Sequence, residues 1–420
     1  QQTIEVVLER AEIQSERVKT QRGIGIRIIK DKKLGFAFTS TLSKPSIEEA
    51  CRNARSLANV SIPNPDWVLL PTPAKLPKLP SGIYDEKTAS VGGDEILKLS
   101  MQAYDEAKGY DKRVDIDDGK FSGFLNEVAI SNLHGVEAEE KTTLLQGYLI
   151  CVAKEHREAS SMAFEYDIAR SMKDFSPGRI GRLAAEKALA TLKPRAVKPF
   201  IGKVILDSDP ASTILLNPII SGVNADNVQR GRSLWAGKLG EEVASQQLTI
   251  TDDGLFPKGI GSSSFDSEGV PHQKTPVITR GKLEGYLHNA YTANKDKKKS
   301  TGNAYRDGYY MLPIIYTSNL IVEAGKKKLE NIISEVDKGI IVRRFSGNVR
   351  PESGEFSGIA KQASYIEKGE IKYPLKETMI SGNAFQALKN IIQIGSETRP
   401  TLLKAYVPPI IVDKINIVSK

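Results

Sequence analysis

Proline dominates the stretch between residues 61 and 81 and limits what the N-terminal part of this chain can become. Six prolines fall between Pro63 and Pro80. Proline fixes the backbone φ angle and has no N–H to donate, so it is poorly tolerated inside a helix or a central strand. We therefore predict an extended connector over residues 61–81 that wraps the surface, with folded elements on both sides of it.

A β-hairpin followed by a helix is predicted ahead of the connector. Apolar residues alternate on both sides of the polar run 30–33 and predict a hairpin with one apolar face, formed by Ile24, Ile26, Ile28, Leu34, Phe36 and Phe38. Ser46 and Glu49 suggest a capping-box start for the helix. Apolar residues at three-and-four spacing then predict one buried stripe, made of Ile47, Ala50, Cys51, Ala54, Leu57 and Ala58.

Helices and paired strands are also predicted after the connector. The expected elements are a helix over Asp94–Ala107, a strand from Val128, a turn at Asn132–Gly135, a strand over Leu145–Val152 and a helix over Gly178–Leu192. Pairs of strands that each lead into a helix favour an α+β layer with largely antiparallel pairing.

Two domains are expected, because 420 residues are too many for one small core. We predict an N-terminal α+β domain over residues 1–195 and a C-terminal α+β domain over 196–420, each with a largely antiparallel sheet packed by helices. No apolar run approaches the ~20 residues needed to cross a bilayer. Nothing resembles a signal peptide, although the first residue is Gln1, so we expect no membrane association and a cytoplasmic location.

The second domain is expected to open with a strand over Lys203–Leu206 and a helix capped by Asp209, with Pro210 at its first position. Pro218 is expected to interrupt this helix. Proline removes one backbone hydrogen bond and crowds the carbonyl four residues earlier, so a continuous helix there would cost about 3 kcal/mol.

Charge and cysteine content argue against several classes of protein. The net charge of +8 would permit contact with an acidic surface, but charge alone does not identify a partner. The lysine-rich runs 295–299 and 326–328 carry no interleaved aromatic residue, so we interpret them as solvated loops rather than a nucleic-acid site. Cys51 and Cys151 lack metal-binding spacing, and Cys51 is predicted to be a buried thiol.

The remaining candidate catalytic groups have simpler explanations. The four histidines form no His-x-x-x-His pair, and we expect each at the surface or in a turn: His134, His156, His272 and His288. Two acidic pairs resemble acid–base dyads, Asp252–Asp253 and Asp266–Glu268. Both pairs precede a glycine, so turn chemistry explains them without catalysis.

Three long blocks of sequence carry a family resemblance. They are residues 22–37 around the hairpin, residues 265–306, and residues 353–383. With the segments 202–207 and 222–228, these blocks resemble the TldD/PmbA family, also called the modulator of DNA gyrase family. The resemblance extends over nearly the whole chain and implies a two-domain α+β subunit. In this family, TldD-like and TldE-like chains assemble into a peptidase that degrades or trims peptides.

The stretch 217–222 departs from the family's metallopeptidase branch, which reads His-Glu-x-x-x-His there, with zinc-binding histidines and a glutamate base. Asn217, Pro218 and Gly222 occupy those places and can supply neither imidazole nitrogens nor a proton acceptor. The family's zinc subunit also uses a C-terminal cysteine as a ligand, and this sequence has none after Cys151. The resemblance therefore implies the TldE/PmbA-like branch, with no catalytic residue, metal or cofactor in this chain.

The resemblance also implies partners. We expect a TldD-like subunit that bears zinc, a peptide substrate, and a homodimer when the chain is isolated. Two alternatives stay open: a self-sufficient peptidase that uses another site, and a regulatory protein that contacts gyrase or DNA.

A peptide channel is the last expectation. Glycines and apolar residues in the third block suggest strands, and exposed strand edges bind extended peptides through main-chain hydrogen bonds. We expect this block and the loop around 301–306 to line a channel shared with the partner, with the candidates Thr301, Gly302, Asn303, Arg306, Ser353, Gly354, Phe356, Ser357 and Gly358. The alternative is that these glycines only turn a small barrel or sheet.

Overall fold

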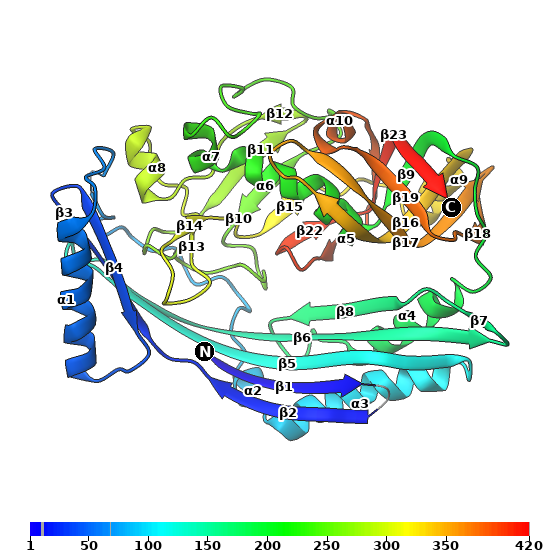
Figure 1. Cartoon of the computed structure of the whole chain (residues 1–420), viewed down its shortest axis with the longest axis horizontal. Coiled ribbons are helices and arrows are strands. Elements are labelled where there is room, and N and C mark those ends of the chain that lie inside the picture. The colour runs from blue at the N-terminus through cyan, green and yellow to red at the C-terminus, as the bar shows by residue number, and fades with distance from the viewer. Residues whose placement is uncertain (10–11, 68, 420) are drawn as a thin grey trace.

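The computed structural model describes residues 1–9, 12–67 and 69–419. Figure 1 shows a lower half built on a long curved sheet and an upper half that contains the shorter strands and the C-terminus. A hairpin and one helix stand upright at one end of the lower half. The mixture of helices with mainly antiparallel sheets confirms the α+β prediction.

A six-stranded antiparallel sheet forms the lower half. Its order is β2-β1-β5-β6-β7, and β8 pairs with β6. The expected turn at Asn132–Gly135 is confirmed, but β5 begins at Val114 rather than Val128, because its register with β6 continues past a bulge near Ile116. The strands are β1 Gln2–Glu9, β2 Glu12–Thr20, β5 Val114–Ser131, β6 Glu137–Glu155, β7 Glu158–Ala159 and β8 Ala163–Ala169.

Helices α3 (Gly93–Tyr110) and α4 (Pro177–Leu189) pack on this sheet, close to their predicted ranges. They approach so closely that a Cβ on Gly181 would lie 2.0 Å from the carbonyl oxygen of Ala103. The short helix α2 (Glu86–Ala89) precedes them. Among the helices described, none is long and apolar enough to cross a membrane.

The predicted hairpin and helix are confirmed as β3 (Ile24–Lys30), β4 (Lys33–Thr39) and α1 (Lys44–Val60). The predicted helix start was wrong. Ser43 is the N-cap, with its side chain accepting from the main-chain N–H of Ser46, so Ser46 lies inside the first turn. Pro45 fits this earlier start, because the first turn of a helix needs no proline N–H.

The buried face of α1 is narrower than the sequence pattern suggests. Ala50, Ala54 and Ala58 are buried, whereas Cys51 and Leu57 are exposed, contrary to the prediction. A hairpin of two strands covers only one strip of the helix. Contact along that strip is very close, since a Cβ on Gly35 would lie 1.9 Å from the carbonyl oxygen of Ala54.

The connector is extended as predicted, with neither helix nor strand in the described part of residues 61–81. It contacts both halves of the molecule. Asn132 Nδ2 donates to the carbonyl of Pro71 at 2.8 Å, and Asn64 Nδ2 donates to the hydroxyl of Tyr291 at 2.9 Å. The connector therefore runs from the lower sheet to the upper half.

A small barrel lies in the upper half. Strands β16, β9, β23, β19 and β17 pair in that order, and β16 also pairs with β17. Only the β16–β9 pair is parallel. Their bounds, with the attached strands β18 and β20, are β9 Phe200–Leu206, β16 Lys338–Val349, β17 Glu355–Glu367, β18 Glu370–Pro374, β19 Thr378–Asn383, β20 Ile391–Ile394 and β23 Ile410–Ser419.

A second sheet of six strands, in the order β12-β11-β10-β15-β22-β21, lies beside the barrel. A two-stranded ladder of β13 and β14 accompanies it. The bounds are β10 Ile250–Asp253, β11 Lys274–Thr279, β12 Lys282–Leu283, β13 Ala304–Tyr305, β14 Ile314–Ile315, β15 Leu320–Val322, β21 Arg399–Pro400 and β22 Ala405–Val407. The short helices of this half are α7 Ala225–Gln229, α8 Ala290–Lys295, α9 Leu329–Ser334 and α10 Ala384–Lys389.

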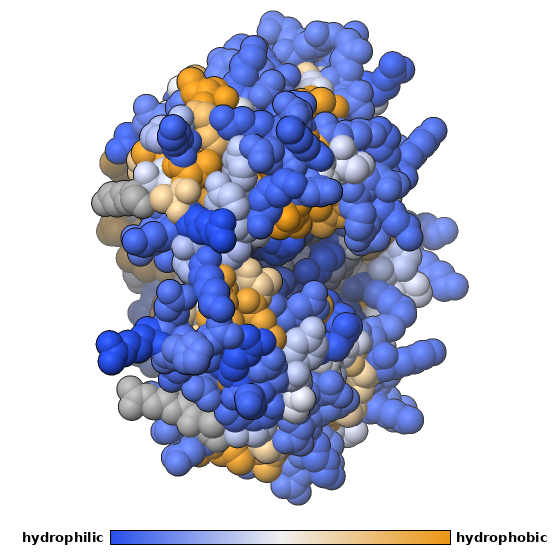
Figure 2. Space-filling model, turned by 90° about the vertical axis from the view of Figure 1, so that its right-hand side faces the viewer, coloured by the Kyte–Doolittle hydropathy of each residue, from blue (hydrophilic) through white to orange (hydrophobic). Residues whose placement is uncertain are grey.

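Separate hydrophobic cores serve the two halves. One gathers buried residues from Ile4 to Ala188, and the largest of the others gathers residues from Val197 to Ile417. The proposed domain boundary at 195/196 falls between these clusters and stays a prediction. Polar contacts join the halves, and Figure 2 shows the surface hollowed between them.

Candidate functional site

A continuous helical run of residues 208–223 crosses the core of the upper half. It consists of α5 (Ser208–Ala211), one π-helical turn (Ser212–Leu216) and α6 (Asn217–Val223). The predicted cap was wrong, because Asp207 rather than Asp209 caps the run by accepting from Ser208 N–H at 2.8 Å.

Pro218 does not interrupt the helix, which corrects a second prediction. The π-helical turn ends directly before α6, so Pro218 enters in the first turn of a new α-helical segment. A π turn widens the helix and shifts its carbonyls away from α-helical spacing, which relieves the crowding that proline causes. The freed carbonyl of Thr213 accepts a hydrogen bond from Asn217 Nδ2 at 3.2 Å.

The three positions 217, 218 and 222 all lie on α6. Asn217 is half-buried and its amide nitrogen is used within the helix, while Pro218 and Gly222 are buried. A Cβ on Gly222 would lie 2.9 Å from Cε3 of Trp235. The indole of Trp235, which packs edge-on against Phe385 at 5.5 Å, thus fills the space that a side chain at 222 would need. The sequence pattern gave no sign that Trp235 lies here.

Two histidines are less exposed than predicted. His288 is buried rather than at the surface, and burial lowers its pKa. Its Nδ1 lies 3.3 Å from Thr292 Oγ1 in α8. Burial also lowers the pKa of His272, to about 4. Within residues 1–9, 12–67 and 69–419, no three His, Cys, Asp or Glu side chains gather closely enough to hold a metal ion.

Asp252 and Asn303 form the centre of a buried polar network. Asn303 Nδ2 donates to Asp252 Oδ2 at 2.6 Å, and the N–H and hydroxyl of Ser318 donate to the same carboxylate at 2.8 and 2.9 Å. Thr301 Oγ1 donates to Asn303 Oδ1 at 2.6 Å. Burial raises the pKa of Asp252 to about 6. The network fixes the start of the loop 301–306.

Asp266 holds the same loop at the next residue, Ala304. It accepts from the N–H groups of Glu268 and Val270 at 2.9 Å and from Ala304 N–H at 3.0 Å. The turn chemistry expected for Asp266 is confirmed, but its burial was not foreseen. Burial, and then the charge of Glu268, raise the pKa of Asp266 to about 7. All three of these acceptor contacts hold main chain, so they support a structural role.

Glu268 connects the hairpin to the upper half. One carboxylate oxygen pairs with Arg27 at 2.7 Å, and the other accepts from Ala290 N–H at 2.8 Å, at the start of α8. Arg27 and Glu268 are 241 positions apart in sequence, so no local pattern could have paired them. Arg306 ends the loop 301–306, and its N–H donates to Ser267 Oγ at 3.0 Å.

The second candidate segment has a different place in the fold. Ser353 and Gly354 form the turn between β16 and β17, with Gly354 at φ +77°. Phe356 belongs to the core. Gly358 pairs with Gly347 on the neighbouring strand β16, where a Cβ on either would lie 2.4 Å from the other's Cα. These observations favour the barrel interpretation for Gly358, and a channel role for the segment stays a prediction.

Sequence reasoning placed the two candidate segments on one channel. In the described part of the chain, no hydrogen bond joins residues 301–306 to residues 353–358. The first segment lies with the buried acids Asp252 and Asp266, and the second lies at the barrel beside α10. The structure thus gives the loop 301–306 the stronger case for a site.

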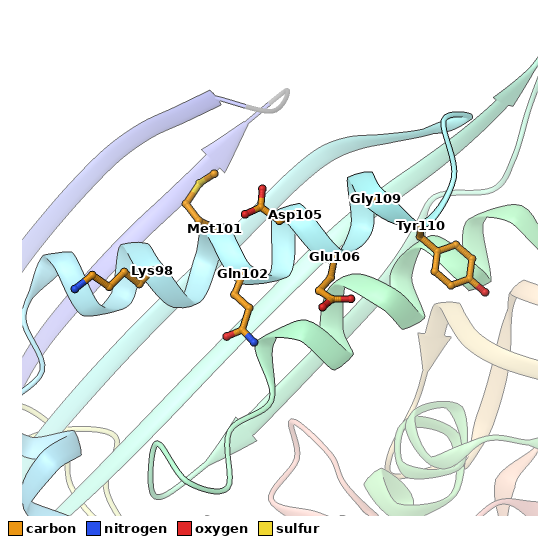
Figure 3. A pocket seen from close by; sticks show the side chains of 7 residues that line it. All are labelled: Lys98, Met101, Gln102, Asp105, Glu106, Gly109 and Tyr110. Atoms are coloured by element: carbon orange, nitrogen blue, oxygen red, sulfur yellow. The ribbon is translucent and has the colours of Figure 1, made fainter.

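One further hollow lies on the lower half (Figure 3). A single helix, α3, lines it with Lys98, Met101, Gln102, Asp105, Glu106, Gly109 and Tyr110. Their side chains spread along the helix rather than converge on one point (Figure 3). We therefore assign no chemistry to this hollow.

Three domain models of one family match nearly the whole chain. Residues 1–58 match the model described as PmbA/TldA metallopeptidase domain 1, residues 86–192 match the central domain, and residues 201–419 match the C-terminal domain.

Individual relatives carry both branch names. The metalloprotease PmbA of Escherichia coli O157:H7 is 27% identical over 416 residues, covering 95% of this chain and 87% of the relative. A metalloprotease TldD homolog of Buchnera aphidicola subsp. Acyrthosiphon pisum is 27% identical over 406 residues, covering 94% and 83%. Overall identity therefore does not separate the two branches.

The fold has a solved counterpart in TldE from Thermococcus kodakarensis. The two share 25% identity and a TM-score of 0.92, over 100% of this chain and 95% of the other. Sequence models and fold agree along the chain. The protein belongs to the PmbA/TldD metallopeptidase family.

Proposed function

We propose that this chain is the TldE/PmbA-like subunit of a TldD/TldE-type metallopeptidase complex. It acts in peptide processing or degradation without a zinc site of its own. The observation that carries the proposal is the packing at Gly222, where the Trp235 indole occupies the space of a ligand side chain. Asn217 and Pro218 complete a set of residues that does not fit zinc, since zinc sites use imidazole, thiolate or carboxylate ligands.

The partner in this proposal is a TldD-like subunit that bears zinc. Support comes from the TldE of Thermococcus kodakarensis, which shares the fold over the whole chain, and from relatives named as metalloproteases. The contribution of this chain is then a wall of the peptide path. The loop 301–306 suits that role because Asn303 and Ala304 donate buried hydrogen bonds to Asp252 and Asp266, which hold the loop rigidly.

The test compares the chain alone with the chain expressed beside a TldD-like subunit. Zinc content is measured by elemental analysis and cleavage by release of a quenched fluorescent peptide. We expect substoichiometric zinc and no cleavage for the chain alone, and both zinc and cleavage for the co-purified pair. Stoichiometric zinc together with cleavage by the chain alone would refute the proposal and favour the self-sufficient peptidase.

A further inference from the structure

Strand β4 of the upright hairpin has a free edge. Within the described residues, β4 pairs only with β3. Both residues of the turn 31–32 have positive φ, so this two-residue turn makes Lys30 and Lys33 a hydrogen-bonded pair, and the ladder alternates from there. The main-chain N–H and C=O groups that point away from β3, toward the free edge, are therefore those of Leu34, Phe36 and Phe38.

These edge groups have no other main-chain partner in the part of the chain that the structure describes. None of the main-chain hydrogen bonds outside the helices and strands involves Leu34, Phe36 or Phe38 there. Open strand edges invite pairing with other chains, and proteins usually cover them or place charges on them. An open edge beside aromatic side chains is therefore a candidate for binding an extended segment.

An open hollow of about 540 Å³ lies along this edge, and α1 forms one of its walls. Ala37 lies on the hairpin face that α1 covers, the same face as Gly35 two residues earlier. Leu57 is 49% exposed and adds apolar surface to this wall. Asn53 and Ser56 add exposed polar side chains.

Aromatic rings form the opposite wall of the hollow. Alternate residues of a strand point to opposite faces, so Phe36 and Phe38 point away from α1. Phe38 is 53% exposed, and its ring centre lies 6.4 Å from that of Tyr310. The neighbouring Tyr309 is packed closely, since a Cβ on Gly23 would lie 2.3 Å from its ring. The hairpin therefore supports this wall.

The position and charge of the hollow favour a peptide. Its lining includes residues from both faces of the hairpin and, among the described residues, none from β3, so it borders the free edge of β4. The same lining residues include no Lys, Arg, His, Asp or Glu, so the hollow suits an uncharged side chain. It also adjoins the proposed wall of the peptide path, because the guanidinium carbon of Arg306 lies 5.9 Å from the ring centre of Phe36.

We propose that the edge of β4 binds an extended segment of the peptide substrate and that the hollow takes one of its large apolar side chains. The main chain of the peptide pairs with Leu34, Phe36 and Phe38, as extended peptides do when they add to an open sheet edge. Walls on both faces leave space for a single chain, which favours an unfolded peptide over the edge of a folded sheet. This inference rests on the proposed function and refines it to unfolded peptides with apolar residues.

The experiment measures binding of labelled hexapeptides to the unmodified full chain by fluorescence anisotropy. The parent peptide alternates threonine with valine and has one central phenylalanine. We expect replacement of the phenylalanine by serine to weaken binding by about tenfold, because burial of the ring in the hollow is lost. Equal binding of the two peptides, or binding of neither, overturns the inference.

N-methylated peptides test the strand pairing. The N–H groups of an extended peptide point alternately toward and away from the strand beside it. Two versions of the parent peptide therefore carry N-methyl groups on the two alternate sets of amides. We expect one set to weaken binding by about tenfold and the other to change it by less than about twofold. Equal effects of the two sets would rule out pairing with the edge of β4.

Variants assign the binding to the hollow. Leu57→Ser and Tyr310→Ser should each weaken binding of the parent peptide by about fivefold and change binding of the serine peptide little. The control is Val60→Ser, which changes a residue of the same helix that is 80% exposed and does not line the hollow. Unchanged binding in both lining variants contradicts the assignment. The peptide comparisons need no variant, so a variant that fails to fold does not compromise them.

Light scattering of the full chain distinguishes a second copy from a peptide. Self-association that Leu57→Ser abolishes, with peptide binding unchanged, would show that the edge pairs with another copy and would overturn the inference. Equal binding of the peptides would leave the zinc and co-purification test untouched. Failure to recover a zinc-bearing partner would refute the complex, while the N-methylation result on the isolated chain would still be measurable.

Discussion

At the residue scale, Gly222 carries only a hydrogen atom where any other residue carries a Cβ, and the packing around it depends on this. Its neighbour Trp235 leaves room for glycine only, so the position cannot simply regain a ligand by substitution. Interiors are packed at the density of organic crystals, and an added group forces its neighbours to move.

Gly222→Ala should therefore lower the free energy of unfolding by about 1–3 kcal/mol. The matched control is Gly109→Ala in α3, where a Cβ meets nothing within 4 Å. There the same substitution should stabilise by about 0.5–1 kcal/mol, because alanine restricts the unfolded chain and favours helix. Urea denaturation of both variants provides the measurement. Equal effects at the two sites would contradict the packing argument.

Asp266 gives a pH-dependent prediction. Its pKa in the folded state is raised to about 7, above an unfolded value near 3.9. The folded state therefore binds the proton of Asp266 more tightly than the unfolded state does. The resulting contribution to the free energy of unfolding is present at low pH and is lost as pH rises through about 7. Asp266→Asn should remove that loss. The free energy of unfolding of the variant, relative to that of the wild type, should therefore rise by about 2–4 kcal/mol from pH 4 to pH 8.

The measurement is urea denaturation at several pH values, with the difference between the two proteins plotted. Taking the difference cancels other groups, such as His272, whose lowered pKa has the opposite effect. A gap that does not change with pH would show that Asp266 is not a buried acid with a raised pKa.

At the element scale, α1 shows the limit of a helical pattern. The three-and-four spacing correctly predicted a helix and its alanine stripe. It also predicted Cys51 and Leu57 as buried, because a sequence shows that a helix is amphipathic but not how wide a surface covers it. Only the two-stranded hairpin decides that width.

The reactivity of the two cysteines tests how much of α1 is buried. Cys51 is exposed, whereas Cys151 is buried in β6, where burial raises the pKa of its thiol to about 12. We expect a thiol reagent such as Ellman's reagent to modify one cysteine in the native protein and both after denaturation. Cys51→Ala should abolish the native reaction. Two reactive thiols in the folded protein, or none, would contradict the arrangement of α1.

The helical run 208–223 also differs from what its sequence pattern predicted. Proline at position 218 predicted a break, but one π-helical turn before it lets the helix continue. Sequence patterns assume α-helical spacing, and a single wider turn falls outside that assumption.

At the scale of the whole molecule, hydrogen bonds between distant residues hold the halves together. Tyr166 of β8 donates to Asp209 Oδ1 at 2.5 Å and to the carbonyl of Pro400 at 3.1 Å. Arg170 Nε donates to Gly259 O at 3.0 Å. Burial of such groups is tolerated because each is hydrogen-bonded.

Tyr166→Phe should destabilise the protein by about 1–3 kcal/mol, since it leaves a buried acceptor on Asp209 without its donor. Tyr84→Phe is the control, because Tyr84 is 40% exposed. That variant should stay within about 0.5 kcal/mol of the parent. Thermal unfolding and limited proteolysis at the junction measure the effect, and equal behaviour of both variants would show that the Tyr166 contact contributes little.

The sequence by itself determined the local elements and the family. Alternation, helical spacing and proline gave the hairpin, α1, α3, α4 and the connector, because these depend on neighbours a few residues away. The residues at 217, 218 and 222 likewise excluded imidazole ligands there without any coordinates.

Only the tertiary structure decided what surrounds those residues. It brought Trp235 onto Gly222, paired Arg27 with Glu268, and closed the barrel at Gly347 and Gly358. These contacts join residues far apart in the chain, and burial, which sets their charge states, depends on the packing of both halves. No local pattern contains that information.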